Sequence, residues 1–91
     1  MTLPFNPGDI VVCLERVFYH TPEQAGRSWF DPMPDDALLV LHIDPWSSIG
    51  QSRLFTITVL HNNVVYNTLY GADRDELSRT HRLVARAADA V

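Results

Sequence analysis

The chain has 91 residues, of which 46% are hydrophobic and 20% charged, with a formal net charge of −4. This length supplies one hydrophobic core, so we expect a single domain over residues 1–91, and the composition excludes a disordered chain. The acids are concentrated in the first fifty residues, which hold seven acids and two arginines. With no lysine anywhere, the chain lacks the dense basic stripe that nucleic-acid binding requires.

Residues 1–7 lack the basic start and long apolar stretch of a secretory signal. No apolar run approaches the ~20 residues that cross a bilayer. We therefore expect a cytoplasmic protein that does not associate with membranes. The single cysteine, Cys13, lies in an apolar run from Ile10 to Leu14, and we expect it to be a buried hydrophobic residue rather than a reactive thiol.

The first predicted strand covers residues 9–14 and follows a Pro-Gly turn. Residues 37–43 predict another strand, which is apolar on both alternating faces and is closed by Asp44-Pro45. That pattern is typical of a strand covered on both sides, so we expect it to be central in the sheet.

Residues 18–36 lie between these two strands and contain three prolines and a glycine. Such a segment cannot be regular secondary structure throughout, and long loops in small domains are usually functional or folded back on themselves. Its large apolar side chains indicate that it packs against the domain. They are Phe18, Tyr19, Trp29, Phe30 and Met33.

Two β-rich runs, residues 53–60 and 64–70, predict a hairpin. The asparagines between them tolerate positive φ and favour a two-residue type I′ turn. That turn would pair Val59 with Tyr66 on the core face. A three-residue loop would instead pair Val59 with Val65 and change the buried set of the second strand, so both registers remain open at this point.

The end of the chain has two interpretations. Asp73 and Glu76 have the spacing of a capping box and predict a helix whose apolar positions continue to Val91. Alternatively, residues 75–78 form one 3₁₀ turn and residues 80–84 form a short closing strand. Local propensity favours the helix, whereas closure of a barrel favours the strand.

The predicted order is a strand, the long aromatic loop, a strand, a medium loop over residues 46–52, a tight hairpin, and a short turn before a last strand. This layout resembles the SH3-like barrel. The resemblance implies a mainly β fold, namely an SH3-like, five-stranded, partly open barrel with a long first loop and a short helical turn near the C-terminus. The Ala-Leu-Tyr motif and third-strand tryptophan of eukaryotic SH3 domains are replaced by Val12–Leu14 and Arg53–Phe55, so no ligand-binding residue is carried over.

Two further segments, Phe5–Val12 and Leu60–Tyr66, resemble segments of short barrel proteins of bacteria and their phages. This resemblance implies an accessory role in the infected cell or in the phage particle rather than an enzyme.

No motif predicts catalysis. His42 and Asp44 share one side of a strand, but nothing else has the spacing of metal ligands, so we expect neither a metal nor a cofactor. The serines lack a nucleophile elbow, and Asp35-Asp36 after a proline is more typical of a loop end than of an acid–base pair.

The strongest functional signal is the set of aromatic residues beside acids. Aromatic faces flanked by carboxylates suit a cationic or proline-rich peptide. We therefore expect a non-enzymatic protein-interaction module. The alternative is a structural or self-associating homo-oligomer in which these rings seal the barrel mouth or a dimer interface. The predicted partner-binding residues are Tyr19, Trp29, Phe30, Asp31, Asp35, Asp36 and Trp46.

Overall fold

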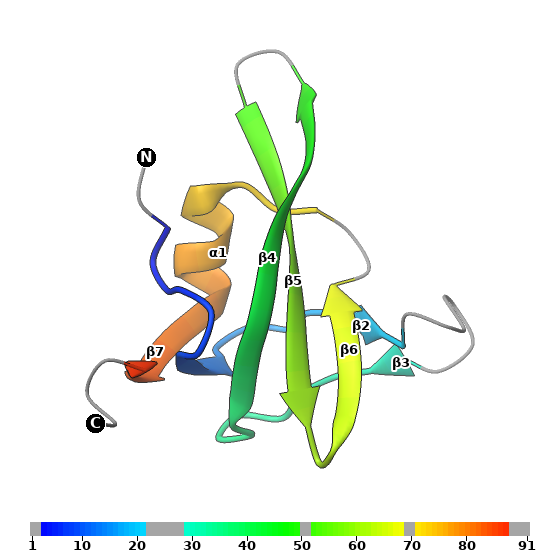
Figure 1. Cartoon of the computed structure of the whole chain (residues 1–91), viewed down its shortest axis with the longest axis vertical. Coiled ribbons are helices and arrows are strands. Elements are labelled where there is room, and N and C mark those ends of the chain that lie inside the picture. The colour runs from blue at the N-terminus through cyan, green and yellow to red at the C-terminus, as the bar shows by residue number, and fades with distance from the viewer. Residues whose placement is uncertain (1–2, 22–28, 50–51, 69–70, 88–91) are drawn as a thin grey trace.

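The computed structural model describes residues 3–21, 29–49, 52–68 and 71–87, without the side chains of residues 29, 46–49 and 52–53. The strands of this part form one antiparallel sheet in the order β3-β2-β6-β5-β4-β1-β7, with one helix (Figure 1). The elements are β1 (Ile10–Cys13), β2 (Tyr19–His20), β3 (Trp29–Phe30), β4 (Leu38–Ile49), β5 (Ser52–His61), β6 (Val64–Thr68), α1 (Arg74–Thr80) and β7 (His81–Ala85).

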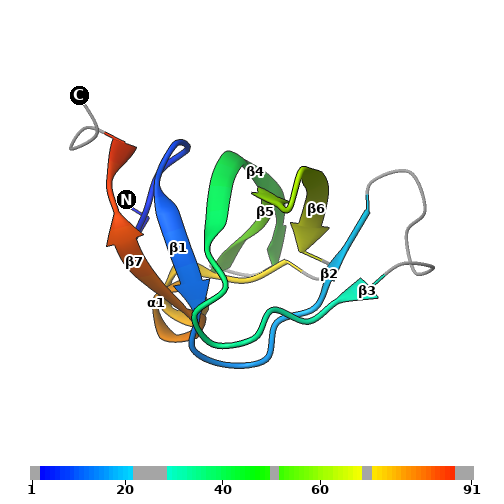
Figure 2. The same ribbon diagram turned by 90° about the horizontal axis from the view of Figure 1, so that it is seen from below.

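The expected mainly β fold is confirmed, and each of the five expected strands has a counterpart, namely β1, β4, β5, β6 and β7. The long loop adds two short strands of its own, because β2 and β3 pair with each other and β2 also pairs with β6. Figure 2 shows that the sheet curves around the core while its end strands, β7 and β3, stay apart. The sheet is therefore not closed.

Strand β4 extends beyond its predicted end. It continues through Asp44-Pro45 to Ile49 and pairs with β5 along this length. The predicted strand end is therefore wrong, and so is the predicted loop for residues 46–49 and 52; residues 50–51 lie outside the described part of the chain. The ladder shifts register between Pro45 and Ser47. Proline is tolerated in a strand at such an irregularity or along an edge, where its missing N–H breaks no regular ladder bond.

The expectation that β4 is covered on both sides is also wrong. Leu38 and Val40 are fully buried, but Leu41 is 40% exposed. A register shift between Val40 and His42 places Leu41 at a bulge. The strand therefore faces the core on one side only.

The β5–β6 hairpin has the predicted two-residue turn. Asn62 and Asn63 have φ angles of 49° and 65°, as a type I′ turn requires. Val59 pairs with Tyr66, which confirms the first register and excludes the three-residue loop.

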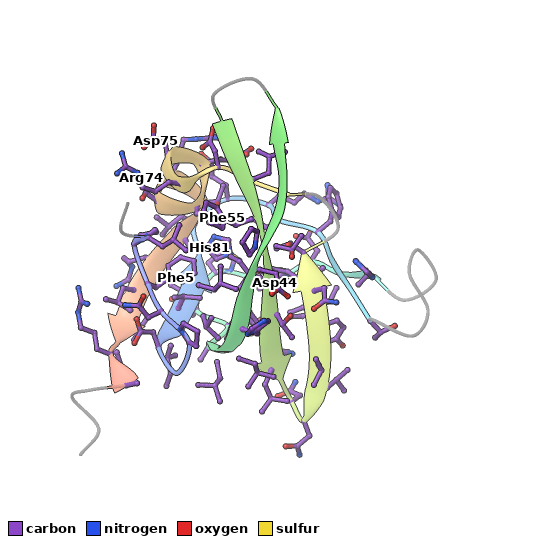
Figure 3. All side chains as sticks on the ribbon, turned by 45° about the horizontal axis from the view of Figure 1, so that its top comes forward. Phe5, Asp44, Phe55, Arg74, Asp75 and His81 are labelled. Carbon is purple, nitrogen blue, oxygen red and sulfur yellow. The ribbon has the colours of Figure 1, made fainter. Side chains whose placement is uncertain are left out.

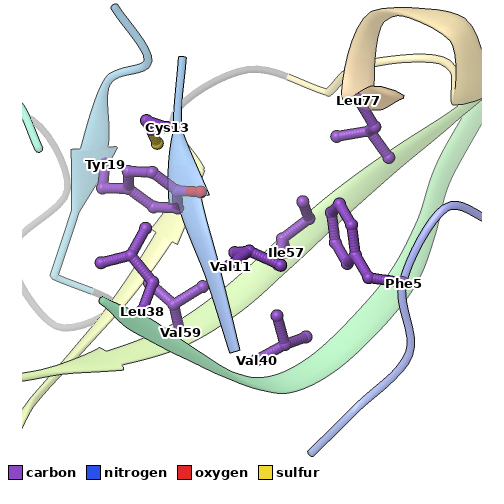
Figure 4. Close-up of a cluster of buried hydrophobic side chains, with 9 residues drawn as sticks. All are labelled: Phe5, Val11, Cys13, Tyr19, Leu38, Val40, Ile57, Val59 and Leu77. Atoms are coloured by element: carbon purple, nitrogen blue, oxygen red, sulfur yellow. The ribbon is translucent and has the colours of Figure 1, made fainter. Parts of the chain in front are cut away.

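The core lies on the concave side of the sheet and is closed by α1 (Figure 4). Leu77 is the buried apolar residue of α1, and Phe5 comes from the segment before β1. The buried cluster consists of Phe5, Val11, Cys13, Tyr19, Leu38, Val40, Ile57, Val59 and Leu77. The expected burial of Cys13 is confirmed.

Each interpretation of the C-terminal region is correct in part. Asp73 caps α1, since its Oδ1 accepts a hydrogen bond of 2.8 Å from the backbone N of Glu76. The helix ends at Thr80, and β7 begins at once and pairs with β1. Strand pairing with β1 therefore prevails over helix propensity beyond Thr80.

Candidate partner-binding site

A cleft opens where the chain leaves β1 and where it leaves β3. Its volume is about 240 Å³. Two large apolar side chains of its lining are strongly exposed, Leu14 at 55% and Met33 at 67%. The lining residues are Cys13, Leu14, Glu15, Arg16, Asp31, Pro32, Met33 and Pro34.

Backbone hydrogen bonds fix both walls of this cleft. On one wall the N–H of Leu14 donates to the carbonyl of Thr80 at 2.7 Å, which ties the segment to the end of α1. On the other wall the N–H of Asp36 donates to the carbonyl of Met33 at 3.1 Å and closes a turn. Pro34 and Asp35, with φ 78°, suit the central positions of a type II turn.

Ion pairs hold the charged residues around the cleft. Arg16 Nε lies 2.6 Å from Asp31 Oδ2, so this pair spans the two walls. Arg79 Nη1 lies 2.8 Å from Glu15 Oε2 and links the first wall to α1. Both pairs are exposed, so they position side chains more than they stabilise the fold.

A second cluster is formed by three rings in contact beside the cleft-forming loop. The Phe30 ring lies 4.2 Å from the His61 ring and 5.0 Å from the Tyr66 ring, between centroids. Asp36 Oδ2 lies 3.8 Å from His61 Nε2. Sequence reasoning missed His61 and Tyr66, although the hairpin register already placed both on the face of Val59.

The structure changes the role of Tyr19. This residue was predicted to contact a partner, but it is fully buried and belongs to the core. The prediction is wrong for Tyr19 because β2 pairs with β6 and turns the ring inward.

The other predicted residues are spread along the loop and β4. Phe30 lies in the ring cluster with His61 and Tyr66, and Asp31 lies in the cleft. Asp35 is exposed in the turn, and Asp36 Oδ2 accepts a hydrogen bond of 3.0 Å from Met33 N. The side chains of Trp29 and Trp46 lie outside the described part of the chain.

A buried hydrogen-bond chain connects Cys13, in the lining of the cleft, to α1 through His81, which Figure 3 labels. The Thr80 hydroxyl lies 2.8 Å from the Glu76 carbonyl and donates to it. It must therefore accept from Nδ1–H of His81, at 2.9 Å. Nε2 of His81 is then an acceptor and receives the Tyr19 hydroxyl proton at 2.7 Å.

Burial sets the pKa values along this chain. It lowers the pKa of His81 to about 4, because the charged ring would lose its hydration. It raises the pKa of Cys13 to about 12, although a hydrogen bond with Tyr19 opposes the shift. Burial also raises the pKa of Tyr19. All three side chains are therefore neutral near pH 7, and Cys13 is not an activated nucleophile.

His42 and Asp44 do share one side of β4, with His42 Nε2 2.7 Å from Asp44 Oδ1, and both side chains are exposed. Among the described residues, no group of three or more His, Cys, Asp or Glu side chains could hold a metal ion. Within the same residues, no helix has both the length and the apolar character to span a membrane.

Comparison of the chain with protein-family models, with curated proteins and with solved structures found no match.

Proposed function

We propose that the chain is a non-enzymatic protein-interaction module, an accessory protein of bacterial or phage type built on an SH3-like, partly open barrel. The strand order β7-β1-β4-β5-β6 supports the SH3-like assignment. The long hairpin-like loop after β1 and the short helix before the last strand support it as well.

The cleft between the walls of Leu14 and Met33 is the proposed partner-binding site. The observation that carries this proposal is the exposure of these two side chains, 55% and 67%, on either side of a hollow. Exposed large apolar residues around a concave surface are typical of sites that bury a partner side chain.

The charges around the cleft favour a basic partner segment. Arg16 and Arg79 already neutralise Asp31 and Glu15. Asp35, two residues after Met33 in the turn, is exposed and has no ion-pair partner among the described residues. A Lys or Arg beside the anchoring apolar side chain would pair with Asp35, and its approach would be steered by the acids of this half of the chain.

A random octapeptide display library tests this function. Selection on the folded protein should enrich peptides that carry Leu or Pro next to Lys or Arg. Titration of the best peptide should shift the backbone amide resonances of residues 14–16, 31, 33 and 35. Met33→Glu should weaken binding at least about tenfold through loss of the apolar contact.

Val84→Glu is the matched control, since Val84 is 52% exposed on β7 rather than at the cleft. Peptide affinity should be unchanged in this variant. Equal affinity of the wild type and Met33→Glu, or resonance shifts confined to other surfaces, would overturn the proposed site.

Self-association is the second candidate function, and the outer face of β4–β6 favours it. Leu41 and Val65 are 40% and 38% exposed there. Leu60 pairs with both Leu39 and Val65 and makes the apolar surface continuous across three strands. Sedimentation velocity over a hundredfold concentration range tests this idea: a dimer that Val65→Lys dissociates supports it, and a monomer throughout excludes it.

A further inference from the structure

A second hollow, of about 150 Å³, lies between α1 and the segment that leads into β2. An engineered cavity of about this volume in another protein accommodates benzene. The lining residues are Arg16, Val17, Phe18, Thr68, Gly71, Ala72, Glu76, Leu77, Thr80 and His81.

One part of the lining is apolar. Val17, Ala72 and Leu77 pack against the hydrophobic core, and the Phe18 side chain stands beside them. A flat apolar group placed here would be removed from water on several sides.

Thr68 supplies an incompletely used polar group. It is only 5% exposed, and its Oγ1 accepts a hydrogen bond of 3.1 Å from the N–H of Ile57. The hydroxyl proton of Thr68 has no acceptor among the described residues. A buried donor without an acceptor is unfavourable. An acceptor atom on a bound molecule would supply the missing hydrogen-bond partner of the Thr68 hydroxyl.

The other polar side chains of the lining already have hydrogen-bond or ion-pair partners. His81 and Thr80 bond to each other, and their remaining bonds go to Tyr19 and to the Glu76 carbonyl. The two charged residues are paired as well, Arg16 with Asp31 at 2.6 Å and Glu76 with Arg79 at 3.8 Å. Because both charged side chains already have ion-pair partners, the cavity disfavours a strongly charged ligand.

We propose that this cavity binds a small neutral molecule about the size of one aromatic ring, which carries a hydrogen-bond acceptor that receives the hydroxyl proton of Thr68. The cavity is separate from the proposed partner cleft, although Arg16 lines both. Ligand binding here does not depend on the proposed interaction function.

Acetophenone and toluene are suitable probes, because they share a ring and differ by a carbonyl acceptor. Amide resonances of residues 17, 68, 72 and 77 should shift saturably with acetophenone. Acetophenone should bind about fivefold more tightly than toluene, the difference expected for one net hydrogen bond.

Variants at two lining positions make the test specific. Thr68→Val should remove the preference for acetophenone, whereas Thr68→Ser, which keeps the hydroxyl, should retain it. Ala72→Leu should block both probes by filling the cavity. Circular dichroism and a thermal melt identify the variants that are folded. If Thr68→Val unfolds the chain, the comparison of the wild type with Thr68→Ser still tests the role of the hydroxyl.

The proposal is overturned by either of two results. The first is the absence of saturable shifts at the cavity residues of the wild type. The second is equal affinity for both probes in the wild type and in Thr68→Ser, because the hydroxyl would then contribute nothing to binding.

Discussion

The hydroxyl of Tyr19 donates to Nε2 of His81 across 2.7 Å and joins the long loop to the last strand. These residues are 62 positions apart in the chain. Their contact continues through Thr80 to the carbonyl of Glu76 in α1. One buried chain of hydrogen bonds therefore holds β2, β7 and α1 together, and two of its members, Thr80 and His81, also line the proposed ligand cavity.

Stability should decrease in mild acid because of His81. Its pKa is about 4 in the folded chain against 6.5 for an ordinary histidine, since burial disfavours the charged ring. The unfolded chain takes up this proton first as the pH falls below 6.5. The free energy of unfolding should thus lose about 3 kcal/mol between pH 6.5 and 4, and this contribution should be constant above pH 6.5.

Urea denaturation at pH 7.5, 6.5, 5.5 and 4.5 measures this effect, and His81→Phe is the control that cannot titrate. Asp9 does not interfere in this range. The backbone N–H groups of Ala87 and Asn6 lower its pKa below the usual 3.8, so its contribution is lost only in stronger acid. The same pH slope in wild type and variant would contradict the assignment to His81.

Removal of the Tyr19 hydroxyl should weaken the fold without changing its shape. Tyr19→Phe keeps the ring in the core but leaves Nε2 of His81 without a donor. We expect a loss of about 1–3 kcal/mol in the free energy of unfolding, the usual penalty for a buried unsatisfied polar group. Tyr66→Phe is the matched control, because no hydrogen bond of that hydroxyl occurs among the described residues; it should change stability by less than about 0.5 kcal/mol. Equal losses in the two variants would refute the proposed importance of the Tyr19–His81 bond.

Local signals in the sequence predicted the local features of the fold. The asparagine turn, the Val59–Tyr66 pairing and the Asp73 cap each depend on a few neighbouring residues, and all three occur as expected. Tyr19 was misplaced because its burial depends on pairing between β2 and β6, which are remote in sequence. The extension of β4 through Pro45 likewise depends on its partner β5.

The candidate site was only partly predictable for the same reason. The acid-rich loop was found from composition, and it does supply Asp31 and Met33 to the cleft. The opposite wall, with Leu14, comes from the end of β1, and only the tertiary fold brings the two walls together.

Gly8 is required by its backbone conformation and by its close packing. Its φ is +94°, and a Cβ added there would lie 2.8 Å from Cβ of Ala87. Gly8→Ala should therefore cost about 1–3 kcal/mol in urea denaturation. The double variant Gly8→Ala/Ala87→Gly removes the steric overlap but keeps the strained φ, so it should recover only part of the loss. Full recovery would mean that φ contributes nothing, and a neutral Gly8→Ala would contradict both causes.

The type I′ turn makes opposite predictions for two substitutions at one position. Asn63, with φ 65°, is in the left-handed region. Asn63→Val should lower stability by about 1–2 kcal/mol, because a side chain with a Cβ branch is unfavourable there. Asn63→Gly should leave stability equal or slightly higher, since Asn-Gly is a preferred pair for this turn. Urea denaturation measures both values, and cross-strand Hα contacts between Thr58 and Asn67 verify that the register is unchanged. A slip by one residue would carry Val59 away from Tyr66 and turn the core face of β6 toward solvent. If Asn63→Val folds with wild-type stability, the prediction is contradicted, and core packing alone, rather than the turn, sets the register.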